Sequence, residues 1–205
     1  MINYKRILLK LSGEALSDNR QKLILDAKHL DIVATAIKSM YEQGVQIAIV
    51  VGAGNIWRGK LAEQIGIERS TADYMGMLGT IINALALQSA IEKTGLECRV
   101  MSAIEVKAVS EPYIKKRAIS HMEKGRIVIF GGGTGNPFFT TDTTATLRAI
   151  EIEADAILMA KNGVDGVYDD DPRTNKDAHF ISEITFGELL SKNLQVMDQT
   201  AVSMI

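Results

Sequence analysis

The sequence predicts an α/β fold, a three-layer sandwich in which helices cover both faces of a central, mostly parallel sheet. Short runs rich in Val, Ile, Leu and Met recur along the chain, and amphipathic helical patterns fill the gaps between them. Two of the apolar runs scarcely alternate with polar residues, which is typical of strands covered on both faces. Strands that alternate with helices are typical of α/β proteins.

Five segments have the length and β-branched content of strands. They are YKRILLKL (4–11), VQIAIVV (45–51), ECRVM (97–101), RIVIF (126–130) and ADAILMA (154–160). Helical spacing of apolar residues predicts helices over 26–43, 73–93, 113–124 and 143–153, and a glycine follows each of the first three as a stop signal. After Lys161, the residues up to Phe180 predict a long irregular loop, followed by a short helix over 185–193 and a last segment with a helical pattern.

Composition indicates one globular domain, because 205 residues suit a single substantial core. The 23 basic and 25 acidic residues nearly balance, so no nucleic-acid or membrane surface is indicated. The single cysteine, Cys98, lies in an apolar run and predicts a core position in a reducing compartment. We find no cleavable leader and no run near the roughly 18 apolar residues of a membrane span, so we expect a cytoplasmic protein.

Polar turns containing glycine follow three predicted strands. They are KLSG (10–13), GAGNIWRG (52–59) and GGGTGNPFFTTD (131–142). In open α/β sheets ligands bind beyond the carboxyl ends of the strands, and glycine lets backbone N–H groups approach an anion closely. Each turn alone is more often simple tight-turn chemistry, but three at one sheet edge predict a phosphate-rich ligand.

Two common nucleotide motifs do not account for these turns. GAGNIW lacks the third glycine of the dinucleotide fingerprint, and no G-x-x-x-x-G-K-[ST] occurs, so a Walker-type loop is excluded. Lys10 and Arg58 stand beside the first two turns, although either could be an ordinary surface cation. Phosphoryl transfer requires positioned cations and N–H donors rather than covalent chemistry, so this pair favours a phosphotransferase.

The chain resembles the bacterial uridylate kinases of the amino acid kinase family over nearly its whole length. The resemblance is carried by YKRILLKLSGEAL, GNIWRG, ADYMGMLGTIINALAL, GTGNPFFTTDT, LRAIEIEADAILMAKNGVDGVYDDDP and the late VMD. It implies in-line transfer of the ATP γ-phosphoryl group to UMP, with Mg²⁺ and without a covalent intermediate, in pyrimidine nucleotide biosynthesis. It also implies a homohexamer, with GTP as an activator and UTP as an inhibitor.

The resemblance assigns roles to individual residues. The catalytic positions are Lys10, Arg58, Asp142 and Asp198. The ATP positions are Lys10, Leu11, Ser12, Gly13, Gly54, Arg58, Asn162, Tyr168 and Asp171. The UMP positions are Ala53, Asp73, Thr134, Gly135, Asn136, Pro137, Phe138, Phe139, Thr140 and Thr141.

The chemistry of several residues agrees with these roles, and each has an alternative. Asp73 could accept ribose hydroxyls or cap a helix, and Asp142 could orient Lys10 or the metal, or cap the helix from Thr143. Asp198 could likewise orient Lys10 or the metal. The threonines and Asn136 offer donors and acceptors for a pyrimidine edge, and the two phenylalanines offer apolar walls or core packing.

No metal site made of protein ligands is predicted. The three histidines have no ligand spacing, and Asp169–Asp171 lack the alternation and glycine of an EF-hand loop. The resemblance implies that magnesium arrives with ATP.

Three departures from the family pattern affect the expectations. Ala53 replaces a usual glycine, so its contact should be through the backbone. The segment 17–22 lacks the glycines of the family's GTP-responsive loop, which argues against activation by GTP. The chain ends at Ile205, so the single domain 1–205 is expected to lack the family's C-terminal strands.

Two other functions remain as alternatives. A carboxylate or carbamate kinase of the same fold would not be expected to carry TGNPFFTTD. A non-catalytic nucleotide-binding or oxyanion-storage protein would keep the glycine turns but lose Lys10 and Arg58.

Overall fold

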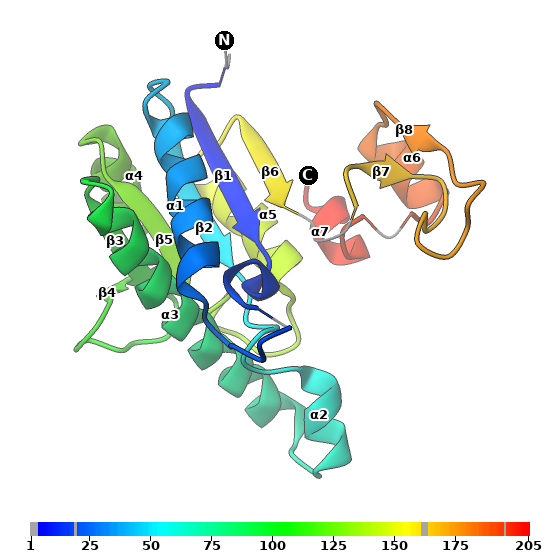
Figure 1. Ribbon diagram of the computed structural model, residues 1–205, viewed down its shortest axis with the longest axis horizontal. Helices are drawn as coiled ribbons and strands as arrows, with labels where there is room; N and C mark the ends of the chain where they lie inside the picture. Colours follow the sequence, from blue (N-terminus) through cyan, green and yellow to red (C-terminus); the bar gives the residue numbers. More distant parts are fainter. Residues whose placement is uncertain (1–3, 19, 161–163, 195) are drawn as a thin grey trace.

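The computed structural model describes residues 4–18, 20–160, 164–194 and 196–205. The predicted α/β class is confirmed, because a six-stranded parallel sheet forms the centre, with helices on both faces (Figure 1). Its strand order is β4-β3-β5-β2-β1-β6. The strands are β1 (Arg6–Leu11), β2 (Gln46–Val51), β3 (Cys98–Ser102), β4 (Glu111–Pro112), β5 (Ile127–Gly131) and β6 (Ala156–Ala160).

Helices fill the connections between the strands. They are the 3-10 turn η1 (Gly13–Leu16), α1 (Ala27–Tyr41), α2 (Gly59–Gln64), α3 (Arg69–Lys93), α4 (Lys115–Glu123), α5 (Thr141–Glu151), α6 (Phe186–Ser191) and α7 (Gln199–Ser203). A separate two-stranded antiparallel pair, β7 (Val167–Tyr168) with β8 (Phe180–Ile181), lies with α6 in a lobe beside the sheet (Figure 1).

Successive side chains of the strands point to opposite faces of the sheet, so the apolar core has one layer on each face. Ile7, Leu9 and Leu11 of β1 pack into a layer with residues of α1 and α3. Leu8, on the opposite face, packs with residues of α4 and α5. Lys10 shares the face of Leu8, since successive side chains of a strand point to opposite sides, so its side chain is directed to the α5 side of the sheet.

The long helix α3 begins earlier than the sequence pattern predicted. It starts at Arg69 behind Glu68 at the N-cap position, so the alternative role of Asp73 as a helix cap is wrong. By length and hydropathy α3 could cross a membrane, which the sequence analysis did not anticipate. Half of its most apolar stretch is buried inside the protein, as in the core helix of an α/β fold.

The start of α5 also differs from the prediction. Thr140 is the N-cap, and its hydroxyl accepts hydrogen bonds from the amides of Asp142 and Thr143, both at 3.1 Å. Asp142 is therefore not the cap, and its carboxylate is free for another contact. The sequence analysis also missed η1, α2, β4 and the β7–β8 pair, which are too short to show a periodic pattern.

Candidate active site

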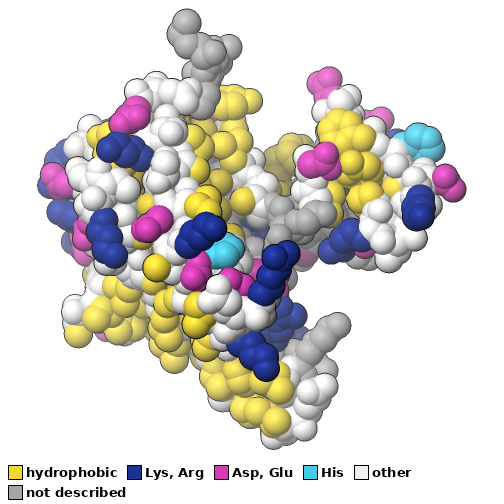
Figure 2. Space-filling model, viewed as in Figure 1, with side chains coloured by type: hydrophobic (Ala, Val, Ile, Leu, Met, Phe, Trp, Pro, Cys, Tyr) yellow, Lys and Arg dark blue, Asp and Glu magenta, His cyan; other side chains and the backbone are white. Residues whose placement is uncertain are grey.

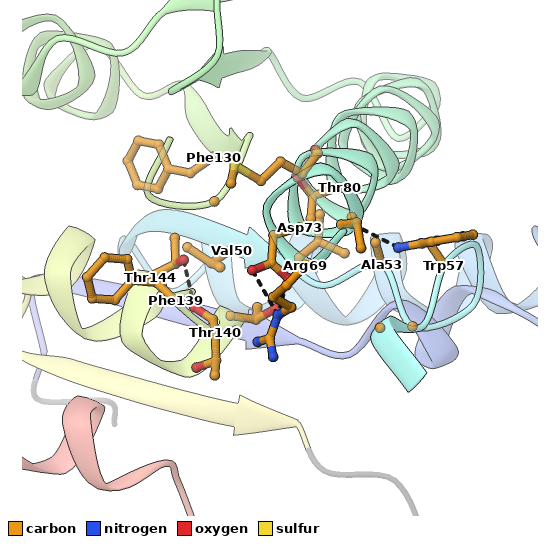
Figure 3. A pocket seen from close by; sticks show the side chains of 18 residues that line it. Val50, Ala53, Trp57, Arg69, Asp73, Thr80, Phe130, Phe139, Thr140 and Thr144 are labelled. Atoms are coloured by element: carbon orange, nitrogen blue, oxygen red, sulfur yellow. Dashed lines mark hydrogen bonds and ion pairs between the residues drawn. The ribbon is translucent and has the colours of Figure 1, made fainter. Parts of the chain in front are cut away.

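Two cavities open at the carboxyl edge of the sheet. The smaller, of about 320 Å³, is lined by residues of β2, α3, the turn after β5 and the start of α5 (Figure 3). The larger, of about 630 Å³, is lined by Lys10, Ser12, Glu14, residues of the segment 164–173, and Asn193, Leu194 and Val196. In Figure 2 the molecule is hollowed between the sheet body and the lobe of β7, β8 and α6. Both volumes fall in the range of small-molecule sites.

The first two glycine turns pack directly on each other. A Cβ added at Gly13 would lie 2.2 Å from Asn55 Oδ1 and 2.7 Å from the carbonyl oxygen of Gly52, so only glycine fits there. Asn83 of α3 fixes the second turn, because its side-chain amide donates to the carbonyl of Gly52 at 2.7 Å and to Asn55 Oδ1 at 2.8 Å. The turns after β1 and β2 thus form one rigid unit.

Lys10 of β1 and Asp142 of α5 form an ion pair. Lys10 Nζ lies 2.7 Å from Asp142 Oδ1, and the two side chains are 14% and 19% exposed. The geometry is that of a charge pair rather than of an aligned hydrogen bond. Lys10 lines the larger cavity, and Thr141, the neighbour of Asp142, lines the smaller. A mostly buried cation of the larger cavity is thus paired with the neighbour of a residue that lines the smaller cavity.

Arg58 reaches back to the first two glycine turns. Its Nε donates to the carbonyl of Gly54 at 3.1 Å, and its Nη2 pairs with the carboxylate of Glu14. The Arg58 side chain is 65% exposed. A phosphate group would find its guanidinium accessible, with Glu14 as the internal partner to be displaced.

Asp73 lies in the wall of the smaller cavity and ties α3 to the third glycine turn. Its carboxylate accepts a hydrogen bond from the backbone N–H of Phe138 at 2.8 Å and two from Arg69 Nε at 3.0 and 3.1 Å. Phe138 has a left-handed backbone with φ of 74°. The carboxylate is held in place at the cavity wall, where a ribose hydroxyl could reach it.

The two phenylalanines have different surroundings. Phe139 lines the smaller cavity, whereas Phe138 is 66% exposed and its ring centre lies 5.9 Å from the Arg69 guanidinium. Of the predicted pair of apolar walls, Phe139 is the one in the cavity lining.

The predicted UMP positions divide into two groups. Ala53, Asp73, Phe139, Thr140 and Thr141 line the smaller cavity. The structure places Thr134, Gly135, Asn136 and Pro137 in the adjoining turn, outside the cavity lining. In that turn the Thr134 hydroxyl accepts from the Asn136 amide at 3.2 Å. Ala53 has no positive φ, so alanine fits where the family pattern has glycine.

Asp198 joins the last helix to the start of α5. It caps α7 by accepting from the Ala201 amide at 2.9 Å, and it accepts hydrogen bonds from the hydroxyls of Thr143 and Thr140. Burial raises the pKa of Asp198, but the hydrogen bonds from Thr140, Ala201 and Thr143 outweigh it and hold the pKa below its ordinary 3.8. Asp198 therefore anchors Thr140, while the carboxylate that contacts Lys10 belongs to Asp142.

The larger cavity collects several predicted ATP positions. Lys10, Ser12, Tyr168 and Asp171 line it. Gly54, also a predicted ATP position, lines the smaller cavity instead. Two hydrogen bonds from Arg173, at 2.9 and 2.8 Å, lower the pKa of Asp171 to about 2. Leu11 is buried in β1, so only its backbone is available there. Asn162 lies outside the described residues.

Several lining residues escaped the sequence analysis. They are Arg69, Met77, Thr80 and Thr144 in the smaller cavity and Arg173 in the larger. Arg69 could have been found from its i,i+4 spacing to Asp73 on one helix. The buried threonines carried no signal, because their spacing is that of any helix interior.

A dedicated metal cage is not built into the described part of the chain, where no group of three or more His, Cys, Asp or Glu side chains could hold an ion. Magnesium, however, commonly binds through one or two carboxylates together with substrate phosphates. The Asp142 carboxylate, paired with Lys10 of the larger cavity and next to Thr141 of the smaller, is a carboxylate of that kind.

Known proteins share this architecture. The sequence model of the amino acid kinase family matches residues 5–205. A uridylate kinase from Rubrobacter xylanophilus is 58% identical over 201 residues, which cover 98% of this chain and 78% of that protein. The crystal structure of UMP kinase from Bacillus anthracis has a TM-score of 0.95 at 49% identity, over 98% of this chain and 82% of that one. UMP kinase from Ureaplasma parvum has a TM-score of 0.93 at 41% identity, over 99% and 86%.

Proposed function

Because the chain belongs to the amino acid kinase family and is a nucleoside monophosphate kinase of the uridylate kinase type, we propose that it transfers the γ-phosphoryl group of ATP to UMP, giving UDP. The observation that carries this proposal is an ion pair that joins Lys10, which lines the larger cavity, to Asp142, the neighbour of Thr141, which lines the smaller cavity. A donor in the larger cavity and an acceptor in the smaller would bring their reacting phosphates together beside Lys10.

The proposed chemistry is a direct in-line transfer. Charge spreads over the equatorial oxygens of the moving phosphoryl group, and positioned cations stabilise it. Lys10 is held ready for this by Asp142, and the exposed Arg58 adds a second cation beside the same turns. Backbone N–H groups of the first two glycine turns complete the donors around the phosphates of ATP.

Magnesium would be held by the phosphates of ATP and by Asp142. When bound, it neutralises charge on the phosphate oxygens. Two features of this chain would position Asp142 for that contact. They are the Thr140 cap at the start of α5 and the ion pair with Lys10.

The acceptor side would read UMP through Asp73 and the threonines at the start of α5. Asp73 would accept ribose hydroxyls, and the run from Thr134 to Thr141 would contact the base and sugar. The alternative of a carboxylate or carbamate kinase on the same fold is disfavoured, because relatives at 58% and 49% identity are uridylate and UMP kinases.

The assembly and location belong to the same proposal. The proposed protein is a single domain that forms a homohexamer in the cytoplasm. Exposed apolar side chains on α3 support the assembly, since Tyr74, Leu78 and Ile82 follow one another at intervals of four and offer a contact surface. Figure 2 shows hydrophobic side chains gathered over the part of the molecule where Figure 1 places α3 and α2. Inhibition by UTP and activation by GTP remain predictions, and the latter is weakened by the composition of 17–22.

An acceptor panel tests the proposal. ADP release from ATP and Mg²⁺ is followed with UMP, CMP, AMP and acetylglutamate in parallel, using the purified protein. We expect release with UMP well above that with the other three. Equal release with all four, or release with acetylglutamate alone, would contradict the assignment of the smaller cavity to UMP.

A further inference from the structure

Two buried polar side chains that the sequence did not assign to the site hold the glycine turn that follows β5. The Thr80 hydroxyl of α3 accepts a hydrogen bond from the amide of Gly132 at 2.8 Å and donates to the carbonyl of Met77 at 2.6 Å. Arg148 of α5 donates through Nη2 to the carbonyl of Gly133 at 3.3 Å. The turn is thus held by helices from opposite faces of the sheet.

The turn has little rigidity of its own. Gly132, Gly133 and Gly135 have φ of 74°, 59° and 83°. Glycine populates many backbone conformations and loses more entropy than other residues when one is fixed. The segment from Thr134 to Thr141 follows directly, so the direction in which it leaves the sheet depends on what fixes Gly132 and Gly133.

Arg148 is itself rigidly placed. Its side chain is 5% exposed, its Nη1 donates to Glu151 Oε2 at 2.7 Å, and its guanidinium carbon lies 3.8 Å from the centre of the Tyr113 ring. The Tyr113 hydroxyl donates to the same Glu151 oxygen at 2.6 Å. A buried cation persists only when it is paired and hydrogen-bonded, and these contacts meet that need while leaving Nη2 directed at Gly133.

The network also reaches the wall of the smaller cavity. Tyr113 packs edge-on against Phe130 with ring centres 5.3 Å apart, and Phe130, Thr80 and Gly133 all line the cavity. Burial, and then the contact with Glu151, raise the pKa of Tyr113 above its ordinary value, so its hydroxyl is protonated and available as a donor at neutral pH.

We propose that Arg148 and Thr80 are positioning residues for the nucleotide acceptor, which fix the Gly132–Gly133 turn so that the following segment meets UMP in one conformation. This inference rests on the proposed function. It predicts that losing either hydrogen bond weakens UMP binding, while ATP, bound at the other cavity, is unaffected.

Arg6 provides a matched control for Arg148. It is also buried and also donates to a backbone carbonyl, that of Ile152, and to Gln46 Oε1 at 2.9 Å. It lies at the amino end of β1, at the sheet edge opposite the cavities. Replacement by lysine keeps the charge of either residue but removes its planar fork of donors.

The experiment compares Arg148→Lys and Thr80→Val with Arg6→Lys and the wild type. We expect Arg148→Lys and Thr80→Val each to raise KM for UMP about tenfold, as expected for the loss of a buried hydrogen bond, with KM for ATP changed less than about twofold. Arg6→Lys should lower the melting temperature without a selective change in either KM. If one site variant fails to fold, the other carries the test.

UMP binding supplies a second readout that does not need turnover. Trp57, the single tryptophan of the chain, lines the smaller cavity, so its fluorescence should report UMP binding. Unchanged UMP affinity in both site variants, or equal weakening of ATP and UMP, would overturn the positioning role. A wild type that binds UMP without turnover would contradict the proposed function alone, and a wild type that binds no UMP would overturn both.

Discussion

Lys10 Nζ and Asp142 Oδ1 lie 2.7 Å apart, although 132 positions separate the two residues in the sequence. β1 directs Lys10 toward the face covered by α5, and the Thr140 cap begins that helix two residues before Asp142. The contact therefore follows from the strand alternation and one helix start. It joins a residue that lines the larger cavity to the neighbour of Thr141, which lines the smaller.

Removing the cation should affect turnover more than binding. We expect Lys10→Ala to lower kcat by about a hundredfold or more, because it removes a group that stabilises transition-state charge, and to leave UMP affinity within about twofold. Steady-state kinetics and Trp57 fluorescence measure the two effects. Lys115→Ala, at an exposed ion pair with Glu153, is the control, and turnover of Lys10→Ala equal to that control would remove Lys10 from the chemistry.

Asp73→Asn should change binding rather than chemistry. The substitution keeps the size of the side chain but removes the negative charge of the carboxylate, whose two oxygens accept hydrogen bonds from Arg69 and from the Phe138 amide. We expect KM for UMP to rise about tenfold with kcat nearly unchanged, since ribose contacts should be similar in the ground and transition states. An unchanged KM for UMP would exclude a ribose contact of Asp73. A capping role would not explain such a result, because α3 begins at Arg69, before Asp73.

Asp198 should contribute stability that depends on pH. Its pKa is lowered on folding, so the contribution is present above its ordinary pKa of 3.8 and is lost as pH falls through the lower folded value. We expect Asp198→Asn to cost about 1 kcal/mol of unfolding free energy near neutrality, allowing for partial exposure. The difference from the wild type should shrink below pH 3.8.

Urea unfolding of Asp198→Asn across this pH range measures the effect. Asp31→Asn, at an exposed position on α1, is the control and should show little difference from the wild type at any pH. A stability difference for Asp198→Asn that stays constant through pH 3.8 and below would contradict the hydrogen-bonded carboxylate.

Gly132 should tolerate no side chain. A Cβ there would lie 2.7 Å from Ser102 Oγ and 2.9 Å from the Ile104 amide nitrogen, at a φ of 74°. Gly44 has a φ of 84° with open space around it, so Gly44→Ala carries only backbone strain. We expect about 1 kcal/mol of destabilisation for Gly44→Ala and about 3 kcal/mol or more for Gly132→Ala, where a clash is added. Equal losses in urea unfolding would contradict the close packing of the turn.

Much of the fold could be predicted because its signals are local. The five strand segments are apolar runs, and the structure has strands at all of them. The two-residue strands β4, β7 and β8 depend on tertiary pairing, which leaves no period in the sequence. The start of α3 was missed because the polar residues before Asp73 carry no apolar spacing, whereas the structure continues the helix back to Arg69.

The candidate site was predictable at the level of segments rather than contacts. The glycine turns indicated which strand ends meet, whereas the pairing of Lys10 with Asp142 is seen only in the structure. The bonds of Thr80 to Gly132 and of Arg148 to Gly133 join residues of different elements, 52 and 15 positions apart in the sequence. They depend on how α3 and α5 pack on the sheet, for which a buried threonine or arginine in a helix gives no sequence signal.

In the proposed reaction, ATP and UMP meet beside Lys10 and one phosphoryl group passes from ATP to UMP. The most direct measurement is ³¹P NMR of ATP, UMP and Mg²⁺ with the wild-type protein, with Lys10→Ala in a parallel sample. We predict that UDP and ADP appear together in equal amounts with the wild type, and far more slowly with Lys10→Ala. ADP and inorganic phosphate without UDP, or UDP formed equally fast by Lys10→Ala, would contradict the account.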